Sequence, residues 1–192
     1  TPGIIIFSLA FITMFTASLV AKDRCSSLTA RLGVSPMKSI NYILGYILSV
    51  IPLILIQNIL FFITAIILGL KFSSNAIYTT LAVIPISILF ISLGILIGTI
   101  TTEKSSSGIS SIIVQLVAFT SGMYFTTDMV GSTFSTICHI LPFESTLNIT
   151  KDILNSNYNN ILPSILIVGI YIVIVIILTI ILFKRKMISD NK

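Results

Sequence analysis

The side chains best suited to chemistry are one histidine and a few carboxylates in residues 126–160. Asp128, His139 and Glu144 are residue types that act as acids, bases or orienting groups in hydrolases. They are scattered, and no nucleophile stands at a set spacing from the histidine. We therefore interpret Asp128, His139 and Glu144 as polar residues exposed to solvent. A membrane-embedded enzyme that acts on lipid at the outer face is the weaker hypothesis.

Patterns for metal or nucleotide binding are absent from the sequence. Cys25 and Cys138 have no metal-ligand spacing, and His139 has no second histidine to complete a site. No G-x-x-x-x-G-K-[ST] motif occurs, so the chain cannot bind ATP through a P-loop. We predict no catalytic residue, no metal and no cofactor, and any ATP hydrolysis would take place in a separate partner subunit.

The composition requires a membrane. Of the 192 residues, 55% are hydrophobic and only 9% are charged, whereas soluble domains carry about 25% charged residues. The net charge of +5 does not indicate nucleic-acid binding, because the cations stand beside apolar runs and form no basic domain. We predict an all-α integral membrane protein.

Five apolar runs are long enough to span a bilayer, whose core of about 30 Å needs about 20 helical residues. A lone strand cannot satisfy its backbone in lipid, so these runs must be helices. The run at 2–21 is too long for the core of a signal peptide. We predict a single transmembrane domain over 1–192, with spans at about 2–21, 40–70, 77–100, 108–125 and 161–183.

Loop charges predict the orientation. Only Lys71 and Lys151 fall outside if the 22–38 loop is cytoplasmic. The other nine cations then lie inside: Lys22, Arg24, Arg31, Lys38, Lys104, Lys184, Arg185, Lys186 and Lys192. This topology places residue 1 outside, the C-terminus in the cytoplasm and residues 126–160 outside. An odd number of spans that starts outside also suggests an earlier helix on the N-terminal side.

A short basic segment, residues 22–36, separates the first two spans. Leu28 and Leu32 are four residues apart and would share one face of a short helix, while Arg24 and Arg31 would reach water or lipid phosphates. The segment could be a solvated loop that only sets the orientation. The functional alternative is a docking element for a soluble partner.

The next span starts below the membrane. Ser35-Pro36 has the form of an N-cap followed by proline at the first helical position. A helix from there to Leu70 would measure roughly 50 Å, well over the bilayer core. Its first turns would therefore lie in the cytoplasm or along the interface.

The stretch DRCSSLTARLGVSP resembles a pattern of the type-2 ATP-binding-cassette (ABC) exporter permeases, ER-E-x-GT-x-x-RL-x-x-[ST]P. Cys25 and Ser27 replace the usual Glu and Gly. Three residue pairs match this pattern in order: Asp23-Arg24, Arg31-Leu32 and Ser35-Pro36.

A second stretch, residues 121–154, is similar to the family's external stretch before the last span, with Pro142-Phe143 at its turn.

The resemblance implies a coupling helix that sits in a cleft of an ATPase subunit. It also implies a second permease subunit, in a homo- or heterodimer, and six spans in the complete subunit, with short extracellular helices before the last one. The family's bacterial exporters carry drugs, peptides, lipids or glycans across the cell membrane. The residues implied in ATPase coupling are Asp23, Arg24, Leu28, Arg31, Leu32, Ser35 and Pro36.

A few polar or small residues lie inside the predicted spans. Gln57, Asn58 and Gln115 could form interhelical hydrogen bonds or line a translocation path. Gly94 and Gly98, four residues apart, would permit close helix contact. No ionisable residue falls within a span, which argues against an ion- or proton-coupled carrier.

The alternative to an exporter is a polytopic membrane anchor or assembly factor without a transport path. That hypothesis predicts that Gln57, Asn58 and Gln115 can each become Leu without loss of function.

Overall fold

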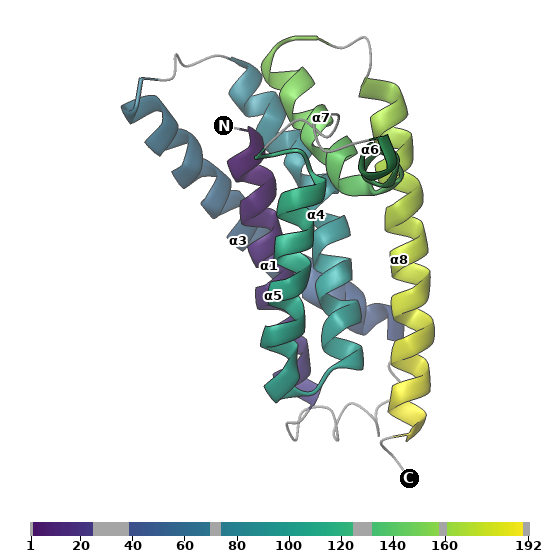
Figure 1. The fold of residues 1–192 in the computed structure, drawn as a ribbon. Coiled ribbons are helices and arrows are strands. Elements are labelled where there is room, and N and C mark those ends of the chain that lie inside the picture. Colours follow the sequence, from purple (N-terminus) through teal and green to yellow (C-terminus); the bar gives the residue numbers. More distant parts are fainter. Residues whose placement is uncertain (1, 25–38, 70–73, 125–131, 158–160, 190–192) are drawn as a thin grey trace.

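A computed structural model describes residues 2–24, 39–69, 74–124, 132–157 and 161–189. Within these ranges every regular element is an α-helix, as the composition predicted (Figure 1). The helices are α1 (Pro2–Arg24), α3 (Ser39–Ile67), α4 (Ser74–Ile100), α5 (Glu103–Thr120), α6 (Ser132–Ile140), α7 (Pro142–Leu154) and α8 (Ile161–Ser189).

Four of these helices, α1, α3, α4 and α8, are long and apolar enough to cross a membrane. The predicted count of five spans is not confirmed, because α5 does not meet that description. It begins at Glu103 rather than near residue 108 and ends at Thr120, and its first turns carry two charges and a run of serines. It nevertheless lies along α1, within the bundle (Figure 1).

The core forms around α4, which packs against α1 on one side and α8 on the other. A Cβ atom on Gly94 would lie 2.7 Å from the Thr13 carbonyl oxygen, and one on Gly98 would lie 2.5 Å from that of Ala17. Helices in lipid associate through such close van der Waals contact. The predicted close approach at the Gly94–Gly98 pair is confirmed, and α1 is the partner.

Two short helices, α6 and α7, precede α8 at the end of the bundle opposite Arg24 (Figure 1). Leu141 separates them, and Pro142 starts α7 at a position where its missing N–H costs nothing. The ring of Phe143 lies 6.0 Å from that of Phe90, between centroids, which places α7 on α4. Short helices before the last span were predicted.

The outer surfaces of α3 and α8 are strongly apolar. Leu48 is 73% exposed and Leu162 is 71% exposed, and each belongs to a long row of exposed aliphatic side chains. In water such a surface would drive association, whereas hydrocarbon solvates it. The first turns of α3 lie near α8, and its last turns project away from the other helices (Figure 1).

Candidate functional site

The C-terminal end of α1 is joined to α3 and α8 by a chain of polar and aromatic contacts. The Tyr46 hydroxyl donates a hydrogen bond to the Asp23 carboxylate. The hydroxyls of Tyr42 and Tyr46 lie 2.8 Å apart. The Tyr42 ring in turn stacks on Phe183 of α8, with centroids 4.5 Å apart and an interplanar angle of 27°. Three helices separated in sequence therefore meet at this end of the bundle.

Arg24, the last residue of α1, ties the same end to α4. Its Nη1 donates hydrogen bonds to the carbonyl oxygens of Gly98, at 3.4 Å, and Thr99. The last carbonyls of a helix lack intrahelical donors and carry partial negative charge, so a guanidinium is a well-suited partner. We call the contacts of Asp23, Arg24, Tyr42, Tyr46 and Phe183 the inner-end cluster, after the side on which the predicted orientation places them.

The remaining predicted coupling residues lie outside the described residues: Leu28, Arg31, Leu32, Ser35 and Pro36. Both flanks of residues 25–38 are described. Arg24 precedes them, and Ser39 opens α3, the helix that carries both tyrosines. The inner-end cluster therefore holds the end of α1 and the start of α3, the two helices that flank residues 25–38. Sequence reasoning named Asp23 and Arg24 but not the tyrosines.

The three polar residues predicted for a path occupy different environments. Asn58 is buried, and its Nδ2 donates to the Ile54 carbonyl oxygen of its own helix at 3.1 Å. Gln57 lines an apolar groove of about 690 Å³ between α1 and α3. Gln115 is exposed on α5. Within the described ranges no hydrogen bond joins any two of them, so they do not form one cluster.

Helix α5 has a polar face that sequence reasoning missed. Lys104, Ser107, Ser111 and Gln115 follow one another at spacings of three or four and are all exposed. An adjoining face, which includes Val114 and Val117, is buried, and the helix packs chiefly on α1. The spacing of the serines with Gln115 was a readable signal of this face. We call these four residues the α5 polar face.

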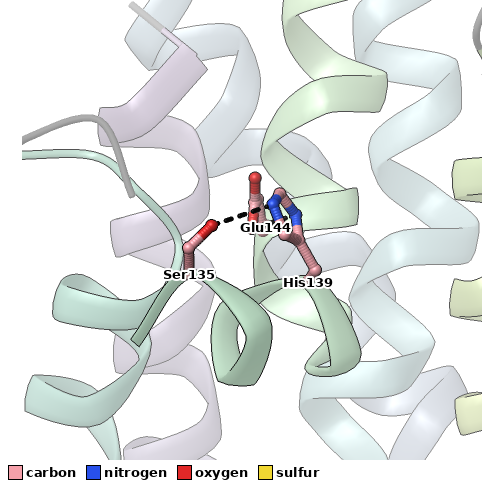
Figure 2. Close-up of polar contacts among 3 residues, drawn as sticks. All are labelled: Ser135, His139 and Glu144. Carbon is pink, nitrogen blue, oxygen red and sulfur yellow. Dashed lines mark hydrogen bonds and ion pairs between the residues drawn. The ribbon is translucent and has the colours of Figure 1, made fainter. Parts of the chain in front are cut away.

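At the other end of the bundle, Figure 2 shows Ser135, His139 and Glu144 in a chain. The Ser135 Oγ lies 3.1 Å from His139 Nε2, and His139 Nδ1 lies 3.1 Å from Glu144 Oε2. His139 and Glu144 looked scattered in the sequence, but the turn between α6 and α7 brings them together. Ser135 was missed, although its spacing of four from His139 places both on one helix face. Asp128 lies outside the described residues.

Cys138 lies next to this chain. Burial raises the pKa of the Cys138 thiol, and the nearby negative charge of Glu144 raises it further. The thiol is thus held protonated, as a structural rather than a reactive cysteine. In the part of the chain that the structure describes, no three His, Cys, Asp or Glu residues gather in a way that could hold a metal ion.

Comparison with known families decides what kind of protein carries these features. A family model described as "ABC-2 family transporter protein" matches residues 1–181. The chain belongs to this family. No curated protein and no solved structure matches it. The predicted membership of this family is confirmed.

Membership of the ABC-2 family, together with four helices fit to cross a bilayer, identifies a multi-pass membrane protein of the permease type. Permeases of this family are generally not catalytic themselves, and in general they work with an ATPase partner. In this ABC-2 chain one of the three pairs that resemble the family pattern, Asp23-Arg24, also anchors the inner-end cluster.

Proposed function

We propose that this chain is the permease subunit of an ATP-driven exporter and that residues 23–36 dock on a separate ATPase subunit. The observation that carries the proposal is the inner-end cluster, which ties both flanks of the docking segment to the membrane helices. Leu28 and Leu32 fill a cleft of the ATPase, Arg31 makes a charged contact, and Ser35-Pro36 begins the return into the membrane.

The cluster gives a physical route for coupling. Closure of the ATPase pair on ATP pushes the docking segment, and the push reaches α3 through Asp23 and Tyr46, α8 through Tyr42 and Phe183, and α4 through Arg24. The close α1–α4 contact at Gly98 makes these two helices move together. A rigid displacement of the inner ends then switches the path between inward and outward access.

A second permease subunit completes the path in this proposal. The α5 polar face is exposed in the single subunit, and polar side chains at membrane depth face protein or a water-filled path rather than lipid. Two subunits that meet across this face would enclose a path lined by Ser111 and Gln115. Gln57 lies beside the apolar groove that opens to lipid, and Asn58 is a packing residue.

The same proposal places the protein in the cell membrane of a bacterium, with its C-terminus in the cytoplasm. Nine of its eleven cations lie inside in this orientation. A path that combines polar side chains with apolar walls suits amphipathic cargo, such as drugs, peptides or lipid-like molecules.

Thiol crosslinking in native membranes tests the docking assignment. A bifunctional maleimide applied from the cytoplasmic side to the full-length chain should join Cys25 to a P-loop ATPase, which mass spectrometry identifies. Cys25→Ser should abolish the adduct. The matched control, Cys138→Ser, should retain it, because Cys138 is buried at the other end of the bundle. Modification of Cys25 without any ATPase adduct would contradict the proposal and favour a membrane anchor.

A further inference from the structure

The coupling proposed above makes no use of the contacts of Ser135, His139 and Glu144, which lie at the end of the bundle opposite the inner-end cluster. We propose that Ser135 is an activated nucleophile that cleaves carboxylic esters with an apolar acyl chain at this face. This activity is independent of ATP and of the coupling proposed above.

The geometry follows the order nucleophile, base, orienting acid. Glu144 Oε2 faces Nδ1 as a charge contact and not as a hydrogen-bond acceptor. The carboxylate charge favours a proton on Nδ1 over Nε2, and in that tautomer Nε2 accepts from the Ser135 hydroxyl. The distance is 3.1 Å at each step (Figure 2). A nucleophile within hydrogen-bond reach of a base that a third group orients is the arrangement of serine hydrolases.

Glu144 is largely buried, whereas His139 is exposed. The Glu144 side chain is 13% exposed and the His139 side chain 59% exposed. Glu144 belongs to the first turn of α7, which packs on α4 and α8, so the fold holds the orienting carboxylate in place. The imidazole stands at the surface, where a substrate can reach it.

The position of Ser135 in α6 supplies donors for a developing oxyanion. It closes the first turn of a nine-residue helix that starts at Ser132. The first amides of a helix have no intrahelical acceptor, and helical side chains lean toward that end. These amides and the helix dipole can therefore stabilise the negative charge that forms on an attacked carbonyl.

The surroundings indicate an amphipathic substrate. Around α6 from His139, the exposed face continues to Ile140, at 62% exposure, and Ile137, at 50%. Adjacent apolar side chains at a membrane-protein surface favour an acyl chain over a charged group. The predicted substrate class is a carboxylic ester of lipid type.

The reaction balances with water as the only co-reactant. The Ser135 oxygen attacks the ester carbonyl while its proton passes to His139 Nε2. The C–O bond to the alcohol then breaks, and His139 returns the proton to the leaving oxygen, which leaves an acyl-serine. Water adds to the acyl-serine with the same proton relay and releases the carboxylic acid.

The test uses the full-length chain in lipid nanodiscs without ATPase or ATP. A fluorophosphonate probe should label Ser135, located by peptide mass spectrometry, and the protein should hydrolyse p-nitrophenyl octanoate. Ser135→Ala should abolish both signals. Glu144→Gln, which keeps the shape of the side chain, should slow labelling by about 100-fold or more. Ser49→Ala, at an exposed serine of α3, should change neither.

Thermal unfolding of each variant in detergent shows whether it is folded. The proposal is overturned if folded wild type turns over the ester no faster than folded Ser135→Ala. It is equally overturned if Glu144→Gln is labelled as fast as wild type, because the chain would then be a structural link between α6 and α7 only.

Discussion

The two ends of the bundle differ in what their polar contacts join. The inner-end cluster connects α1, α3, α4 and α8, and its Arg24–Gly98 contact spans 74 residues of sequence. At the other end, the contacts of Ser135, His139 and Glu144 join α6 to α7, and these three lie within ten residues of one another. The inner-end cluster therefore links helices that are far apart in sequence, whereas the contacts at the other end join neighbouring residues.

The same difference appears in packing. At the inner end, small residues let α1 and α4 approach so closely that a single methyl group would clash. At the other end His139, Ile137 and Ile140 face outward. A close-packed region transmits displacement because its atoms cannot yield independently. The exposed region can change side-chain positions without cost to the rest of the fold.

Gly98→Ala should have the largest effect. The new Cβ would lie 2.5 Å from the Ala17 carbonyl oxygen, so α1 and α4 must separate. Overpacking of this kind costs about 1–3 kcal/mol, and the midpoint of thermal unfolding in detergent should fall by several degrees. Gly45→Ala is the matched control, because nothing lies within 4 Å of its added Cβ and alanine favours helix. An unchanged midpoint for Gly98→Ala would contradict the close contact.

Arg24→Gln should destabilise the inner end by a smaller amount. Hydrogen bonds to a charged group contribute about 1.5–3 kcal/mol, but Arg24 is only partly buried, so solvent screening places the loss at about 1 kcal/mol. Hydrogen exchange should speed up in the last turn of α4 and not in α7. Lys22→Gln, which removes an exposed cation nearby, should leave both rates unchanged. If the last turn of α4 exchanges at the same rate in Arg24→Gln as in wild type, Arg24 does not stabilise the end of α4.

Gln115→Leu and Asn58→Leu should separate a path residue from a packing residue. Gln115 is exposed on the α5 polar face, so its replacement should reduce export while the membrane level and unfolding midpoint stay constant. Asn58 is buried and bonded within its own helix, so its replacement should shift stability by about 1 kcal/mol and leave export intact. Intact export in Gln115→Leu together with lost export in Asn58→Leu would contradict the proposed path.

The smallest expected effect is a change in the rate at which maleimide labels the Cys138 thiol. Because burial and Glu144 raise the pKa of its thiol, the folded protein carries less thiolate than a free cysteine at every pH up to the raised pKa. Maleimide labelling of Cys138 should therefore be slow near neutral pH and should accelerate only at more alkaline pH than in the protein unfolded in SDS. Equal rates in the folded and unfolded protein would show that the thiol is accessible and unshifted.

Sequence reasoning predicted the features that depend on local composition. Apolar runs of about 20 residues predicted the helices that fit a membrane, and the spacing of Gly94 and Gly98 predicted close packing. The start of α5 was misplaced, because Glu103 and the serines after it lower hydrophobicity without ending the helix. Hydropathy alone could not show that this helix continues into the charged loop.

Contacts between residues that are distant in sequence could not be predicted from the sequence. Tyr42 and Tyr46 lie about twenty residues from Asp23, and their meeting depends on how α3 crosses α1 and α8. Nothing in the local pattern specifies that crossing. Ser135 was within reach through its spacing of four from His139, but the link to Glu144 needed the turn at Leu141.

The proposed role of the inner-end cluster is to carry ATP-driven movement into the membrane helices. We would label Gln115→Cys with a membrane-impermeant maleimide, in a background without Cys25 and Cys138, with and without ATP and vanadate. With the cluster intact, ATP should change the labelling rate several-fold. Tyr46→Phe, which removes the hydroxyl bonded to Asp23, should abolish the change, and Tyr78→Phe, at an exposed tyrosine, should keep it. An undiminished response in Tyr46→Phe would contradict the claim.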